Sequence, residues 1–340
     1  MSAFPVAFLK TGLVTSVGLS APATCAALRA KVNNPSETRF KGTDGQWILA
    51  HQVALEKPWR GLPKLVKMAS MAVEEALQDV PKSQWSSVPL LLCVAEPGRP
   101  GRLDGLDDQL FLDIQAEMGV QFASRSAVVA YGRAGVAVAV NQARALISTG
   151  NVNRVLIAAT DSLITWGTLN YYQREARLLT AENSDGFMPG EGAGALLMGK
   201  SEGVPGELVC TGIGFARETA NLDSGEPLRA EGLSQAMKAA LAEAGWRPSE
   251  KCFRIADLSG EQYYFKEASL ALSRAMRERK EDFELWHPSE CIGEAGTVSA
   301  IACIIAGHAA ATKRYAPEPT TIYHFSNDDG ARAVVLTRAK

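Results

Sequence analysis

Asp185-Gly-Phe-Met-Pro-Gly-Glu-Gly-Ala-Gly-Ala-Leu-Leu-Met198 is the stretch that decides the fold of this chain. It places four glycines within nine residues and continues directly into an apolar run from Ala193 to Met198. Clustered glycines are favoured where the backbone adopts positive φ or where two backbones approach closely. The apolar run is typical of a short buried strand. The residues alone predict a tight turn that leads into a core strand, and an ordinary glycine-rich hairpin fits them as well.

The composition excludes several classes of protein. The chain has 340 residues, of which 46% are hydrophobic and 21% are charged, and its net charge is −2. This near-neutral balance predicts no binding to nucleic acid or to an anionic membrane surface. No run of about 18 apolar residues is present, so no membrane-spanning helix is expected. Residues 1–10 lack the basic and apolar regions of a secretory signal, which favours a cytoplasmic location.

The cysteines and histidines predict neither disulfides nor a metal centre. No two cysteines form a C-x-x-C pair, and no two of the four histidines are spaced i, i+4. A chain of this length builds a core without covalent staples, so reduced thiols are expected. No cofactor is expected either. The cysteines are Cys25, Cys93, Cys210, Cys252, Cys291 and Cys303.

Strand-like and helix-like segments alternate along the chain. Residues 88–95 and 155–159 are continuous apolar runs, of the kind buried on both faces of a sheet. Residues 134–148 and 298–311 are helical in pattern and apolar nearly all round, which indicates burial on every side. The alternation predicts an α/β protein with a mainly parallel sheet.

Each half of the chain contains one of these two buried helices, which favours a layered structure with helices between two sheets. Charge, glycine and proline cluster at residues 200–206. A length of 340 residues is also expected to form two domains or two packed halves. We therefore place a boundary between residues 1–203 and residues 204–340.

The turn at residues 185–198 resembles the DGF-x-PGEGAG turn of the β-ketoacyl synthases, which belong to the thiolase-like superfamily. The resemblance implies a thiolase-like α/β fold of five layers, α-β-α-β-α, with two similar mixed-sheet halves. The resemblance covers nearly the whole chain. Residues 11–18 match the opening glycine segment, residues 134–150 the nucleophile helix and residues 155–161 its following strand. Gly293-Glu-Ala-Gly296 matches the glycine segment after a catalytic histidine, and residues 325–336 match the terminal loop and last strand.

The resemblance also implies a catalytic cysteine at a helix N-terminus, where the helix dipole favours the reactive thiolate, and two catalytic histidines. In this chain, the three family positions are occupied by Arg133, Ser259 and Glu290. No cysteine lies between Cys93 and Cys210, so a small shift of register does not restore the nucleophile. Arginine stays protonated and cannot act as an acyl nucleophile. No side chain is therefore assigned a catalytic role.

Arg133 requires compensation, because the helix dipole disfavours a cation at an N-terminus by a few tenths to about 1 kcal/mol. The resemblance places Glu290 beside the same cavity. We therefore expect Arg133 and Glu290 to form a buried ion pair that fills the former active site. The alternative is that Arg133 points to solvent from a reshaped loop, since arginine is seldom fully buried.

The terminal segment Ser326-Asn-Asp-Asp-Gly330 has two interpretations. Its adjacent aspartates bring charge to a tunnel that admits an acyl chain in the family. The same residues also form good solvated turns, because Asn, Asp and Gly satisfy turn geometry.

Cys291 is the remaining candidate nucleophile, since a thiol close to a helix start can be activated. A buried, inert cysteine is the commoner case. The other polar and sulfur-bearing candidates are expected to be structural, to pack in the core, or to bond to local backbone: Cys303, His287, His308, His324, Glu191 and Glu294.

These observations predict a catalytically degenerate ketosynthase-like protein that acts as a binding, scaffold or heteromeric partner subunit in fatty acid or polyketide biosynthesis. The implied partners are a second copy or a ketosynthase-like subunit bound through residues 127–130, an acyl carrier protein, or a secretion or assembly protein. Light scattering that shows a strict monomer at micromolar concentration would contradict the dimer.

The alternative is a divergent 3-oxoacyl-[acyl-carrier-protein] synthase or acyltransferase that uses Ser259, Glu290 or Cys291. An open tunnel from the surface to Arg133 favours the enzyme, whereas a closed cavity favours the binding protein.

Overall fold

The computed structural model describes residues 5–150, 152–247, 250–276 and 283–340. Ten strands of this part of the chain form one continuous sheet, in the order β10-β9-β11-β12-β8-β1-β7-β6-β4-β5. The first half supplies β1 (Val6–Val14), β4 (Leu90–Cys93), β5 (Ala127–Val129), β6 (Arg154–Ser162) and β7 (Glu191–Lys200). The second half supplies β8 (Leu208–Arg217), β9 (Cys252–Ala256), β10 (Leu285–Trp286), β11 (Thr320–Ser326) and β12 (Ala331–Ala339).

The two halves repeat one topology. In each half, the five strands lie in the order third, second, fourth, fifth and first along the chain. In this order, the first three strands of each half are parallel to one another. The fourth strand runs antiparallel to the third and to the fifth. The halves join where β1 pairs with β8 at residues 6–8. The prediction of two similar mixed-sheet halves is confirmed. The prediction of a mainly parallel sheet is wrong, because β7 and β12 run antiparallel to both of their neighbours.

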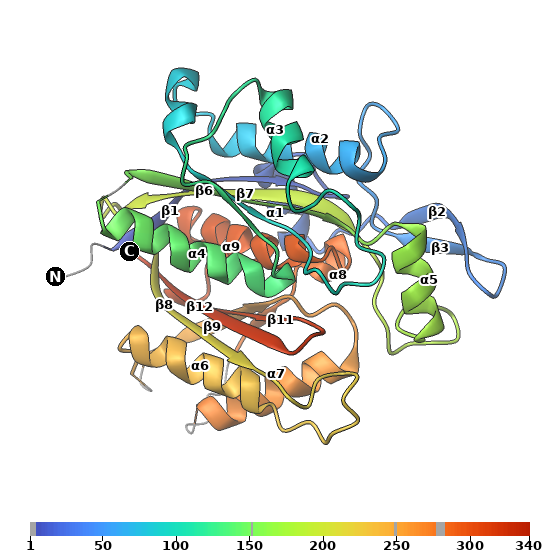
Figure 1. The fold of residues 1–340 in the computed structure, drawn as a ribbon. Coiled ribbons are helices and arrows are strands. Elements are labelled where there is room, and N and C mark those ends of the chain that lie inside the picture. The colour runs from blue at the N-terminus through green and yellow to red at the C-terminus, as the bar shows by residue number, and fades with distance from the viewer. Residues whose placement is uncertain (1–4, 151, 248–249, 277–282) are drawn as a thin grey trace.

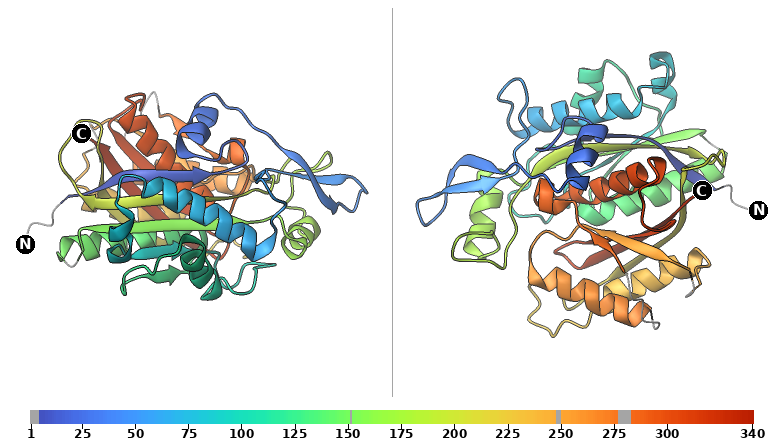
Figure 2. Two further views of the ribbon diagram at one scale, coloured as in Figure 1. Left: turned by 90° about the horizontal axis from the view of Figure 1, so that it is seen from above. Right: turned by 180° about the vertical axis from the view of Figure 1, so that it is seen from behind.

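The layers follow the order α-β-α-β-α (Figure 1). The helices α2 (Gly61–Ala76) and α3 (Gln109–Met118) cover the outer face of the first half, and α6 (Glu231–Glu243) and α7 (Gln262–Ala275) cover that of the second. Between the halves lie α4 (Gly132–Ser148) and α9 (Thr297–Thr312), which contact each other (Figures 1 and 2). The boundary at residues 203 and 204 stays a prediction, and residues 201–207 join β7 to β8.

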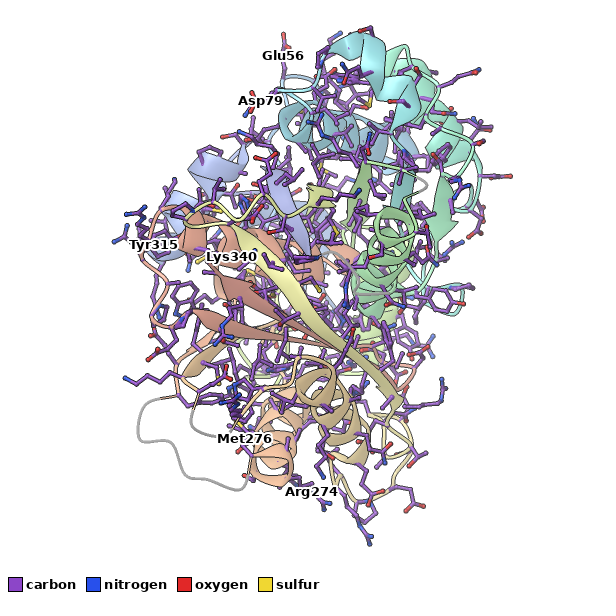
Figure 3. The ribbon with its side chains drawn as sticks, turned by 90° about the vertical axis from the view of Figure 1, so that its left-hand side faces the viewer. Glu56, Asp79, Arg274, Met276, Tyr315 and Lys340 are labelled. Carbon is purple, nitrogen blue, oxygen red and sulfur yellow. The ribbon has the colours of Figure 1, made fainter. Side chains whose placement is uncertain are left out.

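The middle layer forms the largest part of the core. Side chains from both halves fill the space around it (Figure 3). Val298, Ile301 and Ile304 of α9 are fully buried, which confirms the prediction of a helix apolar on nearly every side. Burying each such side chain stabilises the fold by about 1.5–3 kcal/mol.

The glycines of the 185–198 stretch are explained by close approach and not by positive φ. None of the four has a positive φ. A Cβ at Gly190 would lie 2.3 Å from the carbonyl oxygen of Ile292, and one at Gly192 would lie 2.6 Å from that of Val14. The Gly190 N–H donates to the carbonyl of Glu294 at 2.7 Å. The stretch therefore leads into a central strand, instead of an ordinary hairpin, and fixes the loop before α9.

Six further elements complete the described structure. They are α1 (Ala21–Arg29), β2 (Ser36–Lys41), β3 (Trp47–Ala50), the 3₁₀ helix at Lys82–Ser87, α5 (Trp166–Arg174) and α8 (Ser289–Ile292). The β2–β3 hairpin and α5 lie side by side at one end of the molecule in every ribbon view (Figures 1 and 2). Among the described helices, none combines the length and apolar character needed to cross a bilayer.

Candidate functional site

Arg133 lies at the start of α4, at the position that the resemblance assigns to the nucleophile. Its guanidinium faces three carboxylates, with Nη1 3.0 Å from Glu294, Nη2 3.0 Å from Asp328 and Nε 3.6 Å from Asp257. Burial disfavours the charged guanidinium, but Glu294 and Asp257 outweigh that effect and raise the pKa of Arg133 well above its ordinary value. The side chain is only 11% exposed, so the solvent-facing alternative is wrong. The carboxylates compensate for a cation at a helix N-terminus.

The expected ion pair between Arg133 and Glu290 is wrong. Glu290 lies on α8, and its carboxylate is 3.7 Å from Lys31 Nζ at the surface. Helix α8 ends at Gly293, whose φ of 71° turns the chain into the loop before α9. Because of this turn, Glu294 reaches Arg133, four residues after the predicted partner. A buried arginine–glutamate pair does form, with Glu294 in place of Glu290.

Asp328 connects Arg133 to a second arginine, Arg177. Its Oδ2 lies 2.8 Å from Arg177 Nη1, and its Oδ1 accepts a hydrogen bond from the Tyr264 hydroxyl at 2.5 Å. Burial alone raises the pKa of a carboxyl, but Arg177 and Arg133 outweigh it and hold the pKa of Asp328 well below its ordinary value. Asp329, in contrast, is exposed. The terminal segment therefore brings one charge into the site and leaves the other in solvent.

Arg177 is held in turn by Glu261. The Arg177 Nε and Nη2 lie 2.7 and 2.9 Å from the two carboxylate oxygens of Glu261. This paired geometry is the strong, orienting form of an arginine–carboxylate contact. The guanidinium also lies 4.9 Å from the ring centroid of Tyr172. Arg177 is therefore fixed by a carboxylate on each side and an aromatic ring.

A third arginine, Arg99, pairs with Asp161 at the N-terminus of α9. Arg99 Nη1 lies 2.5 Å from Asp161 Oδ2, and the same oxygen accepts a hydrogen bond from the Thr297 N–H at 3.0 Å. A Cβ at Gly296 would lie 2.1 Å from Asp161 Oδ2, and Gly296 has a φ of 58°. Glycine is therefore required where the carboxylate approaches the helix start.

The three arginines line one cavity, and together with their carboxylate partners they are called the ionic cluster. It consists of Arg99, Arg133 and Arg177 with Asp161, Asp257, Glu261, Glu294 and Asp328. The space beside it is a cavity of about 30 Å³, which is room for only a few water molecules. Outside it, and sharing part of its lining, lies a 290 Å³ pocket with Asp223 and Asp329 on its wall. The ionic cluster thus occupies the place where the resemblance puts an acyl tunnel.

Asp257 supplies a titratable group within the ionic cluster. Burial, together with the neighbouring Glu294 carboxylate, raises the pKa of Asp257 to about 7, against the attraction of Arg133. Its Oδ2 also accepts a hydrogen bond from the Ser326 N–H at 2.9 Å. The five carboxylates of the ionic cluster, with Glu96 on the wall of the same cavity, face three arginines, so a proton on Asp257 reduces the excess of negative charge.

Asp257→Asn is expected to stabilise the protein increasingly as the pH rises. The folded pKa of Asp257 is raised above the ordinary value of 3.8, so the wild type loses stability as the pH rises from that value through about 7. Asparagine does not ionise and keeps an acceptor for Ser326. The difference in unfolding free energy between variant and wild type should grow by about 1–3 kcal/mol from about pH 5 to about pH 8. Urea denaturation at several pH values in this range measures the difference. If the unfolding free energies of variant and wild type changed in parallel with pH, the raised pKa of Asp257 would be contradicted.

Ser259 and Cys291 do not join the ionic cluster. Ser259 is half-buried in the loop between β9 and α7, and the residue of that segment that faces Arg133 is Asp257. Cys291 is 1% exposed, and burial, with the nearby Glu290 carboxylate, raises the pKa of its thiol to about 11. A thiolate is therefore disfavoured at Cys291.

The other predicted residues have structural surroundings. Cys303 is fully buried, as expected for a core residue. Burial lowers the pKa of His308 to about 4 and that of His324 to about 3, so both are neutral at physiological pH. Glu191 pairs with Lys64. No group of histidine, cysteine and acidic side chains suited to a metal ion occurs among the described residues.

Five members of the ionic cluster were not singled out in the sequence: Arg99, Asp161, Arg177, Asp257 and Glu261. Asp161 lies two residues after the predicted core strand at residues 155–159, and a carboxylate at that place is the one visible signal. The others lie in loops or at the ends of elements, where no periodicity indicates the direction of a side chain.

The whole chain superposes on ketosynthases. A chain from the complex of a type II polyketide synthase acyl-carrier protein with its ketosynthase matches with a TM-score of 0.83 and 16% identity, over 100% of both chains. The ishigamide ketosynthase/chain length factor matches with a TM-score of 0.80 and 17% identity, again over 100% of both.

An oxazolomycin ketosynthase domain of Streptomyces albus matches with a TM-score of 0.79 and 13% identity, over 99% of this chain and 74% of that chain. No protein-family model and no curated protein matches the sequence. At these identities the likeness shows the fold alone. The chain has the thiolase-like fold of the ketosynthases.

Proposed function

We propose that this chain is a catalytically degenerate, ketosynthase-like subunit that binds a partner instead of carrying an acyl group. The observation that supports this most directly is the ionic cluster at the start of α4. A guanidinium there cannot attack a thioester, because it has no lone pair available at any ordinary pH. The adjoining cavity of about 30 Å³ is too small for an acyl chain, and the 290 Å³ pocket outside it is lined by charged side chains.

The thiols that border the ionic cluster also support a non-catalytic role. Cys93 is fully buried under the start of α4, with its sulfur 3.6 Å from the carbonyl oxygen of Gly135. Burial raises the pKa of Cys93 far above its ordinary value. Burial, with Asp257 and Glu294 nearby, does the same for Cys303. Neither thiol is then a source of thiolate at neutral pH.

The edge strand β5 is the proposed contact with the partner subunit. Within the described sheet, β5 pairs with β4 on one side and has no strand on the other. Ala127 is exposed on β5, and Tyr131, which follows it, is 60% exposed. An unpaired edge is a template for pairing with a second chain. The solved ketosynthase/chain length factor, named as a pair, supports a ketosynthase-like partner, and the acyl-carrier complex supports a carrier protein as a second candidate.

Intact-mass spectrometry of the purified protein after incubation with acetyl and malonyl thioesters tests the loss of catalysis. We expect no covalent adduct, because the ionic cluster offers neither a nucleophile nor space for the acyl group. An adduct that forms in the wild type and is absent from Ser259→Ala or Cys291→Ala would overturn the proposal in favour of a divergent acyltransferase. An active ketosynthase treated in parallel shows that the thioesters are competent.

A further inference from the structure

A second cavity lies at the same end of β6 and β7 as the ionic cluster, at Ser162 and Glu191, and shares no lining residue with the 30 Å³ cavity. It has a volume of about 380 Å³ and is lined by residues of β2, of the start of α2 and of the start of α5. Figure 1 shows where these elements lie. Sites for small molecules have volumes of about 300–1,000 Å³. The cavity is therefore large enough for a ligand of its own.

Three aromatic rings line this cavity: Phe40, Trp59 and Trp166. The Phe40 and Trp166 ring centroids are 6.0 Å apart. Trp59 is 39% exposed and Trp166 is 55% exposed, although large aromatic side chains are usually the most buried part of a fold. Exposed rings on a concave surface offer faces on which a planar group can stack.

The charges that line the cavity leave two guanidiniums without a counter-ion. Lys64 and Glu191 neutralise each other at the floor, with side chains 16% and 5% exposed. Arg39 and Arg60 are exposed, and neither forms an ion pair with another described residue. Arg39 lies 4.8 Å from the ring centroid of Phe40, so one guanidinium is already placed against the aromatic wall. Two free guanidiniums complement a doubly charged phosphate, and arginine binds phosphate through paired hydrogen bonds.

We propose that this cavity binds a small molecule with a planar aromatic ring and a phosphate group. The ring stacks on Trp166 and Trp59, and the phosphate lies between Arg39 and Arg60. An uncharged aromatic molecule would leave both guanidiniums without a counter-ion. A simple acyl chain would neither pair with the guanidiniums nor stack on the tryptophan rings. This site is independent of the proposed partner-subunit function, because it requires no residue of the ionic cluster and no residue of β5.

Isothermal titration calorimetry with adenosine monophosphate as the probe tests this site, with adenosine and inorganic phosphate as the two half-ligands. At low ionic strength we expect saturable binding of the monophosphate. Each half-ligand should bind more weakly by about tenfold or more, since it lacks either the charge-assisted hydrogen bonds or the stacking. Added salt should weaken binding of the monophosphate, because the guanidiniums are exposed.

Variants locate the binding. Trp166→Ala and Arg60→Ala should each weaken binding of the monophosphate by at least about fivefold. Trp47→Ala and Arg125→Ala are the controls, because they remove an exposed tryptophan and an exposed arginine that do not line the cavity. Both should leave the affinity for the monophosphate unchanged. The proposal is overturned by absent saturation in the folded wild type, by equal affinity for adenosine and the monophosphate, or by binding that neither cavity variant weakens.

Discussion

Replacing Arg133 by alanine is expected to lower the free energy of unfolding by about 3–5 kcal/mol, because removing one partner of a buried ion pair leaves the other charges uncompensated. Three carboxylates lie within 4 Å of this guanidinium, those of Glu294, Asp328 and Asp257. Arg177 remains to neutralise Asp328, whereas Glu294 loses the only arginine that it contacts among the described residues. Urea denaturation followed by circular dichroism at neutral pH measures the loss.

Two further substitutions separate charge from other effects at this site. Arg133→Met keeps the length of the apolar stem and should lose nearly as much stability as Arg133→Ala, because the missing charge is the main cause. Arg125→Ala removes an exposed arginine and should change the unfolding free energy by less than about 0.5 kcal/mol. A loss below about 1 kcal/mol in Arg133→Ala would show that the guanidinium does not hold the carboxylates together.

The layered architecture was predictable because it depends on local patterns. The apolar pattern of α9 required burial on nearly every side, and a layer between two sheets provides that, whereas α4 exposes Asn141, Gln142 and Ala145. The glycines at residues 190–194 were equally informative, because close backbone approach excludes any Cβ. The antiparallel direction of β12 was harder to predict from the sequence. It depends on the short turn at Asn327–Gly330, which brings the chain back beside β11.

The ionic cluster was only partly predictable, because its members come from distant parts of the chain. Arg133 could be placed from its helix, but Asp328 lies 195 residues further along and Arg177 pairs with a glutamate 84 residues away. Periodicity indicates which face of an element is buried and not which loop side chains converge there. The error between Glu290 and Glu294 has the same origin. The positive φ of Gly293 redirects the chain by a turn that the residue pattern does not encode.

Stability alone does not explain why charges occupy this position. A well-packed apolar cluster of equal volume is often as stable as a buried ionic one or more so. The start of α9 lies here, however, and its N–H groups favour carboxylates. Asp161 accepts from the Thr297 N–H, and Glu294 accepts from the Gly296 N–H at 2.9 Å. Arg133 and Arg99 then balance carboxylates that the start of α9 holds in place.

Asp328→Asn is the second substitution with a large expected effect, a loss of about 2–4 kcal/mol in unfolding free energy at neutral pH. Asparagine has nearly the same shape and still accepts a hydrogen bond from Tyr264. It lacks the negative charge that Arg133 and Arg177 share, so two buried guanidiniums lose a common counter-ion. Because the pKa of Asp328 lies well below its ordinary value, its stabilising effect is present above about pH 4 and is lost only in acid.

Asp329→Asn is the matched control, since it makes the same chemical change one residue away. Asp329 is exposed, and its carboxylate accepts one local hydrogen bond, from the Ala331 N–H at 2.9 Å. Its substitution should cost less than about 0.5 kcal/mol. A double-mutant cycle of Asp328→Asn with Arg177→Met should give a coupling energy of about 1–3 kcal/mol, because the two side chains are in direct contact. Equal losses in the two aspartate variants, with no coupling to Arg177, would mean that the terminal loop is held by its turn and not by its charge.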